Sequence, residues 1–129
     1  MDWRTLFLSP KGRIGARDFW IGFLIVMAAS LVLNLLQTAG QVLGLVLLWP
    51  QVCIHAKRLH DMGRSAWLLL APLGFALACA GAGALVGTRL AFEVCFGLVA
   101  MFGVGFLLWV GLSSGDPAPN RYGEPPDPV

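Results

Sequence analysis

The feature that most constrains this chain is the recurrence of apolar stretches close to 20 residues long. A helix rises 1.5 Å per residue, so about 20 apolar residues span the hydrocarbon core of a bilayer, which is roughly 30 Å thick. Only 12% of the 129 residues are charged, whereas a soluble domain carries about 25%. The chain is poorly suited to a surface in water, and we expect an all-α polytopic membrane protein.

The stretches predict four transmembrane helices joined by short loops, at about residues 19–36, 41–56, 66–86 and 90–112. Pro50 predicts a kink in the second of them. The leader, residues 1–18, combines cations with an apolar group, which predicts an interfacial segment at the lipid headgroups; the alternative is a disordered leader. Five prolines after Ser113 predict an extended tail. We expect a single membrane domain over residues 1–129.

Basic residues are distributed unequally over this topology. Only Arg89 falls on one side, and the other side holds eight cations. Basic residues near span ends are retained in the cytoplasm. We therefore expect a multi-pass protein of the bacterial cytoplasmic (inner) membrane with both termini cytoplasmic. The eight cations are Arg4, Lys11, Arg13, Arg17, Lys57, Arg58, Arg64 and Arg121.

The polar segment Lys57–Trp67, between the second and third predicted spans, is the densest group of reactive side chains. Much of it suits a turn between helices. Cations match the negative end of a helix, Gly63 fits the left-handed position that ends one, and Ser65 can cap the next. Asp61 opposes the helix dipole by roughly 0.3–1 kcal/mol, so we expect a cationic partner for it.

The partner of Asp61 stays open at this point. Lys57, Arg58 and Arg64 are close in sequence, and Arg13 or Arg17 could reach it if the leader folds over the turn. We therefore expect a cytoplasmic polar cluster that contacts anionic lipid headgroups or a protein partner. Such basic clusters attract anionic lipid by about 1 kcal/mol per charge. The candidate members are Arg13, Arg17, Lys57, Arg58, His60, Asp61, Arg64 and Ser65.

Two chemical readings of the same segment are weaker. A metal site at His55, His60 and Asp61 would place the two rings about 140° apart on a helix, without a third histidine or a cysteine to help. Acid–base catalysis by His60 and Asp61 lacks a nucleophile elbow or a phosphate-binding loop. We expect no catalytic residues, no metal, no cofactor and no nucleic-acid partner.

Transport is the alternative to an accessory role. No ionisable residue lies near the centre of any predicted span, although ion and proton pathways usually place some there. Gly83 and Gly87 form a G-x-x-x-G, which permits close helix packing in lipid. A homo-oligomer acting as a small-molecule or ion transporter, or as a channel subunit, therefore stays open.

Three segments resemble one known family. Gly12–Trp20 is similar to the G-R-x-x-R-x-x-F-W opening of the DUF805 family of small bacterial inner-membrane proteins, although Ala16 stands where the family usually has arginine. Arg58–Trp67 resembles the family's R-L-H-D-x-G-x-S-x-W signature. The closing N-x-Y-G-x-x-P is matched from Asn120, Arg121, Tyr122 and Gly123 onward. The resemblance implies a four-span membrane protein and no defined reaction.

Overall fold

The computed structural model describes residues 3–35 and 43–126, and within these ranges the regular elements are all helical. One isolated bridge, between Asn120 and Gly123, lies in the tail. The all-α prediction is therefore confirmed for this part of the chain. The elements are α1 (Trp3–Leu8), α2 (Ala16–Asn34), α4 (Leu48–Asp61), the 3₁₀ helix η1 (Ala66–Leu69), α5 (Leu70–Val86) and α6 (Arg89–Leu112).

Within the described ranges, three segments are long and apolar enough to cross a membrane: Ala16–Asn34, Ala66–Val86 and Arg89–Leu112. They correspond to the first, third and fourth predicted spans. Residues 36 and 41–42, which belong to the predicted ends of the first two spans, lie outside the described residues.

The helix of the second predicted span is displaced toward the polar segment. Residues 43–46 are helical, a turn follows at Leu47, and α4 then runs from Leu48 to Asp61. Pro50 lies in the first turn of α4, where its missing N–H removes no intrahelical hydrogen bond. The helix is therefore interrupted at Leu47, on the N-terminal side of the proline.

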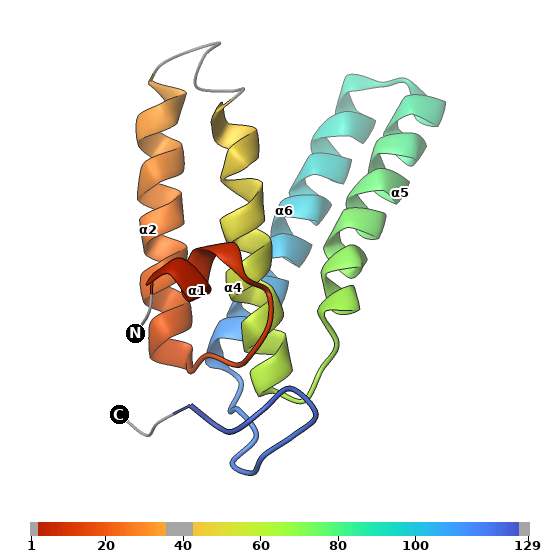
Figure 1. Cartoon of the computed structure of the whole chain (residues 1–129). Helices are drawn as coiled ribbons and strands as arrows, with labels where there is room; N and C mark the ends of the chain where they lie inside the picture. The colour runs from red at the N-terminus through yellow and green to blue at the C-terminus, as the bar shows by residue number, and fades with distance from the viewer. Residues whose placement is uncertain (1–2, 36–42, 127–129) are drawn as a thin grey trace.

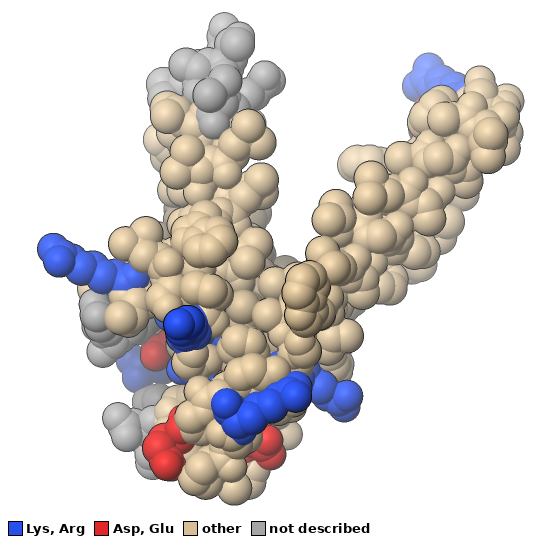
Figure 2. All heavy atoms as spheres, turned by 45° about the vertical axis from the view of Figure 1, so that its right-hand side comes forward, with Lys and Arg blue, Asp and Glu red and all other residues tan. Residues whose placement is uncertain are grey.

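The helices form two pairs that meet at one end. α2 packs on α4, α5 packs on α6, and α6 also contacts both α2 and α4. In Figure 1 the short α1 crosses the first pair near its lower end, and the tail passes beneath α4 and the lower end of α6. Figure 2 shows the two pairs diverging away from this end, and most of the Lys and Arg atoms in view gather where the pairs meet.

The packed core lies at the same end. Leu6, Phe19, Ile54, Leu59 and Val110 are fully or almost fully buried, and they come from the leader, α2, α4 and α6. Toward the far end the helix surfaces are apolar and exposed, as Leu85 illustrates at 91%. Leucine-rich exposed helix surfaces suit contact with lipid chains, which are equally apolar.

Small residues allow the helices to approach closely. A Cβ on Gly111 of α6 would lie 3.1 Å from Phe19 and closer still to the Trp20 ring, both on α2. Gly83 of the G-x-x-x-G faces Phe92 at 3.2 Å, so this glycine packs α5 against α6 within one chain. Gly87 ends α5 with a left-handed φ of 68°.

We expect Gly111→Ala to destabilise the fold by about 1–3 kcal/mol, because the added methyl group overlaps two aromatic rings of the core. The measurement is the thermal midpoint of the purified protein in detergent. Gly97→Ala on the same helix is the control, since a Cβ there meets nothing within 4 Å. Equal midpoints for the two variants would contradict the close contact between α2 and α6.

Candidate functional site

The turn after α4 closes with backbone hydrogen bonds that end the helix. The Gly63 N–H donates to the His60 carbonyl at 3.0 Å, and the Arg64 N–H donates to the Leu59 carbonyl at 2.8 Å. This pairing is the Schellman motif, and it needs a left-handed residue. Gly63 supplies it with a φ of 68°. Ser65 then accepts from the Trp67 N–H at 3.3 Å and caps η1.

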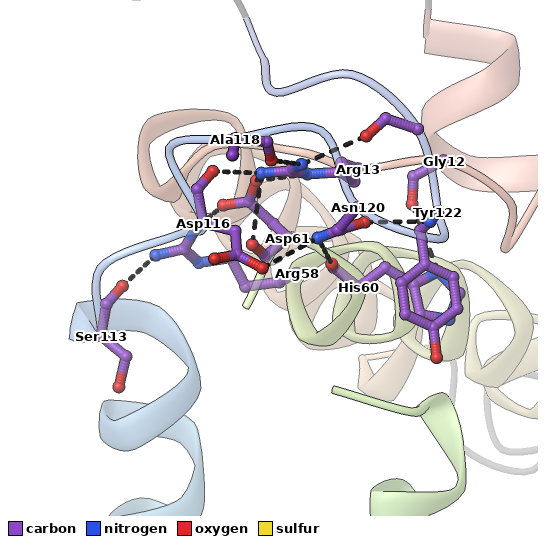
Figure 3. A network of polar contacts seen from close by, with 11 residues as sticks. Gly12, Arg13, Arg58, His60, Asp61, Ser113, Asp116, Ala118, Asn120 and Tyr122 are labelled. Carbon is purple, nitrogen blue, oxygen red and sulfur yellow. Dashed lines mark hydrogen bonds and ion pairs between the residues drawn. The ribbon is translucent and has the colours of Figure 1, made fainter. Parts of the chain in front are cut away.

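Asp61, the last residue of α4, is the centre of a buried ion-pair cluster. Its side chain is 4% exposed, and its two carboxylate oxygens accept from two different guanidinium groups. Arg13 donates to Oδ1 through Nε at 3.1 Å, and Arg58, one turn earlier on α4, donates to Oδ2 through Nη1. We call Arg13, Arg58 and Asp61 the arginine–aspartate cluster (Figure 3).

Arg13 connects the leader to the tail. Besides Asp61, its guanidinium donates to the backbone carbonyls of Ala118 at 2.8 Å, Gly123 at 3.2 Å and Asp116. The side chain is 1% exposed. A planar guanidinium has five N–H donors in a fixed fork, so one arginine can bind a carboxylate and several carbonyls at once. Arg13 therefore fixes the path of the tail.

Arg58 connects α4 to the end of α6. Its Nε donates to the Val110 carbonyl at 3.1 Å, and its Nη2 donates to the Ser113 carbonyl. The last carbonyls of a helix have no intrahelical partner and carry partial negative charge. Burial lowers the pKa of Arg58 below its ordinary value, and the charge and hydrogen bond of Asp61 offset only part of this effect. The guanidinium thus acts as a cap for α6.

The tail reaches Asp61 through its backbone as well. The Asp116 N–H donates to the Asp61 carbonyl at 2.7 Å. Gly115 passes so close to the carboxylate that a Cβ there would lie 2.8 Å from Asp61 Cγ. A side chain at this position is incompatible with the cluster, so glycine is required by the close approach.

His60 lies beside the cluster and holds the tail by different contacts. Its ring stacks on Tyr122 with centroids 3.8 Å apart and planes 9° from parallel. Nδ1 lies 3.2 Å from the Gly12 carbonyl, which only accepts, so this nitrogen carries the proton. The Asn120 amide donates to the His60 carbonyl at 3.0 Å. Burial lowers the pKa of His60, the bond to Gly12 raises it, and Arg121 lowers it further.

The remaining predicted residues divide into buried and exposed groups. Lys57 is 4% exposed and its ammonium group donates to the Thr5 carbonyl of α1. Arg17 and Arg64 are exposed, and neither side chain makes a hydrogen bond or ion pair to another described residue. The expectation that Lys57 and Arg58 face lipid headgroups does not agree with their burial, since the leader and the end of α6 occupy their donors.

Sequence reasoning missed the part of the cluster that the tail supplies. The carbonyls of Asp116, Ala118 and Gly123 belong to the backbone. Every residue has such a carbonyl, so the residue type does not indicate which ones accept a hydrogen bond. The signal that could have found them is the number of donors on Arg13 and Arg58, which exceeds what one carboxylate can accept. Two buried arginines around one aspartate therefore predict additional carbonyl partners.

The geometry limits the chemistry that the cluster can perform. Both carboxylate oxygens of Asp61 are bound by guanidinium groups, so it is not placed to remove a proton from a substrate. Where the structure describes the chain, no three His, Cys, Asp or Glu side chains lie together as metal ligands would. The arrangement instead joins four separate segments at one point.

One family model matches most of the chain. The family model DUF805, described as a protein of unknown function, matches residues 7–124. Two curated relatives, each named "Uncharacterized protein YiiR", come from Escherichia coli strain K12 and from Escherichia coli O157:H7. Each is 47% identical over a segment that covers 49% of this chain and 54% of the relative.

The chain therefore spans about half the length of the curated relatives it matches. No solved structure gives a significant match.

We predict that Asp61→Asn lowers the free energy of unfolding by about 3–5 kcal/mol, because it leaves two buried guanidiniums without a counter-charge. Glu93→Gln is the matched control. Glu93 also pairs with an arginine, Arg89, but both side chains are exposed, at 58% and 92%, and an exposed pair contributes about 0–1 kcal/mol. Chemical or thermal unfolding in detergent measures both. Equal losses would show that burial of the pair has no energetic consequence.

We predict that acidification weakens the fold through His60. Because the folded pKa lies below the ordinary value of about 6.5, the unfolded chain binds a proton first. Stability is therefore complete above about pH 6.5 and falls as the pH decreases toward the folded pKa. Thermal midpoints at pH 7.5 and 5.5 measure the loss.

The comparison for this prediction is His60→Phe, which keeps a flat ring against Tyr122 and cannot titrate. The wild type should lose more stability on acidification than the variant, and the other titrating groups, including His55, cancel in the difference. The same loss in both proteins would remove His60 as the source.

Proposed function

The chain belongs to the DUF805 family, a family of unknown function, and from that premise we propose a non-enzymatic accessory protein of the bacterial inner membrane. In this proposal its cytoplasmic end contacts anionic lipid headgroups or a membrane-protein partner. The observation that carries the proposal is the division of the cations at this end into a buried group and an exposed group. The buried group holds the fold together, and the exposed group stays available for binding.

The topology of the proposal has four spans and cytoplasmic termini. The second span, predicted at residues 41–56, takes in residues 43–46 and the part of α4 up to Ala56, beside the three long apolar helices. Arg89 begins α6 at the far end of the second helix pair, whereas the leader, the end of α4 and the tail lie together at the other end (Figure 1). This asymmetry is the one that retains basic segments in the cytoplasm.

Arg17 and Arg64 are the cations best placed to bind headgroups. Arg17 is in the first turn of α2, and Arg64 lies between α4 and η1, so both flank membrane helices directly. The exposed carboxylates of Asp116 and Glu124 lie in the tail, which passes beneath the helix ends, farther from the bilayer in this topology. Anionic lipid is attracted by about 1 kcal/mol for each such cation.

The absence of enzymatic activity is part of the proposal. It is supported by the saturation of the Asp61 carboxylate and by the position of His60 between Gly12 and Tyr122. The alternative, an oligomeric transporter or channel subunit, predicts a symmetric oligomer and solute flux through liposomes. A test of lipid binding can distinguish the two, because the oligomeric state and solute flux are observed separately from bound lipid.

We predict that the purified protein retains anionic phospholipid in native mass spectrometry and that Arg17→Gln with Arg64→Gln weakens this binding. At about 1 kcal/mol per charge, two charges correspond to roughly a 30-fold change in the dissociation constant. Arg89→Gln, at the opposite end, is the control and should retain wild-type binding. Unchanged binding in the double variant, or a symmetric oligomer that conducts solute, would contradict the proposal.

A further inference from the structure

A second site lies inside the helix bundle, where the two helix pairs begin to diverge. The cavity measures about 340 Å³, and its lining comes from both pairs, including Phe23, Gln51, His55, Pro72 and Phe106. Figure 2 shows open space between the pairs above their junction. The cavity therefore forms the apex of a wedge that opens sideways between α2 with α4 and α5 with α6.

The depth of this apex follows from helix geometry. His55 and Gln51 precede Asp61 on α4 by six and ten residues, which corresponds to about 9 and 15 Å along the helix axis. With Asp61 at the membrane surface, both polar side chains lie within the hydrocarbon region. Polar groups at this depth are costly unless something satisfies them.

One buried polar atom at the apex, Gln51 Oε1, lacks a hydrogen-bond partner among the described residues. His55 is 8% exposed, and its Nδ1 lies 2.8 Å from the Gln51 carbonyl. A carbonyl only accepts, so Nδ1 carries the proton and the neutral ring leaves Nε2 as an acceptor. The apex thus holds two acceptors, and the Gln51 amide nitrogen adds a donor.

The chemistry of the lining specifies what can bind. The described residues that line it include no Lys, Arg, Asp or Glu, so a phosphate or ammonium headgroup would enter without a counter-charge. A hydroxyl group both donates and accepts, and it therefore matches an amide oxygen beside an amide nitrogen. The walls that continue from the apex are apolar, with Val52, Leu69 and Leu107 among them, and suit a hydrocarbon chain.

We propose that this wedge binds a neutral membrane lipid whose polar end is a free hydroxyl group. The hydroxyl donates to Gln51 Oε1 or His55 Nε2, and its chain lies between the two helix pairs. A diacylglycerol and a polyprenol alcohol share this chemistry. From the proposed function the inference takes only that the helices cross the bilayer, and it does not depend on Arg17 or Arg64.

The experiment measures ligand-induced thermal stabilisation of the full chain in detergent. The probes are 1,2-dioctanoylglycerol and farnesol, which carry hydroxyl groups. Two further probes share the dioctanoyl chains: the 3-acetyl ester, which lacks the donor, and dioctanoyl phosphatidic acid, which is charged. The measurements are made on the wild type and on the variant with Arg17→Gln and Arg64→Gln, which lacks the proposed headgroup site. In this variant we expect the hydroxyl probes to raise the midpoint increasingly with their free concentration and the other two to have little effect. Which hydroxyl probe binds more tightly identifies the lipid source.

The site variant is Gln51→Leu, which replaces the amide side chain with an apolar one. Loss of one hydrogen bond should weaken binding about fivefold to tenfold. The control is Asn34→Leu, which also replaces an amide on a membrane helix but lies on α2, bonded to the Ser30 carbonyl. It should bind like the wild type, as should Arg17→Gln with Arg64→Gln, so this test and the headgroup test can fail separately.

The proposal is overturned if the acetyl ester or phosphatidic acid stabilises the variant with Arg17→Gln and Arg64→Gln as well as the alcohols do. It is also overturned if Gln51→Leu binds with wild-type affinity. A midpoint that depends on protein concentration and not on any probe would identify a second copy of the chain as the occupant, and would equally reject a lipid hydroxyl.

Discussion

The buried carboxylate of Asp61 is the interaction on which the rest of this structure depends. Placing an ion in a site that water does not reach costs several kcal/mol unless opposite charge and hydrogen bonds surround it. Here two guanidiniums enclose one carboxylate, and the excess positive charge faces the carbonyls of Val110, Ser113, Asp116 and Ala118. A site with this many directional bonds accepts one arrangement of the chain. Its main effect is therefore to specify which segments meet, more than to add stability.

The fold was largely predictable, because length and polarity decide it. Apolar stretches of membrane-spanning length can become little other than helices in lipid, and the all-helical fold of the described residues follows. The turn after α4 was also predictable. Its left-handed Gly63, at φ 68°, and its helix cap Ser65 follow from the local preferences of these residue types. Pro50 predicted a disturbance of this helix but not the position of the interruption at Leu47, because the effect of a proline depends on where the helix begins.

For the candidate site, the sequence predicted that Asp61 needs a cationic partner but not which residues supply it. Asp61 at the end of a helix requires a cation, and the sequence offers several; Arg58 and Arg13 are the two that reach it. Arg13 lies 48 residues away, so no spacing rule selects it over Arg17. The burial of Lys57 depends on α1 crossing α4, a tertiary contact that composition does not reveal. The distribution of charge along the sequence thus predicted where the site lies. Which of its charges are exposed depends on tertiary packing.

One carboxylate holds both the leader and the tail against α4, and hydrogen–deuterium exchange of the backbone amides can test this arrangement. Asp61→Asn should accelerate exchange in α1 and in residues 114–124 together, because Arg13 loses its anchor and the tail loses Arg13. Exchange in the α5–α6 turn, remote from the cluster (Figure 1), should stay unchanged. Acceleration confined to one of the two segments, or none in either, would show that Asp61 does not hold both segments in place.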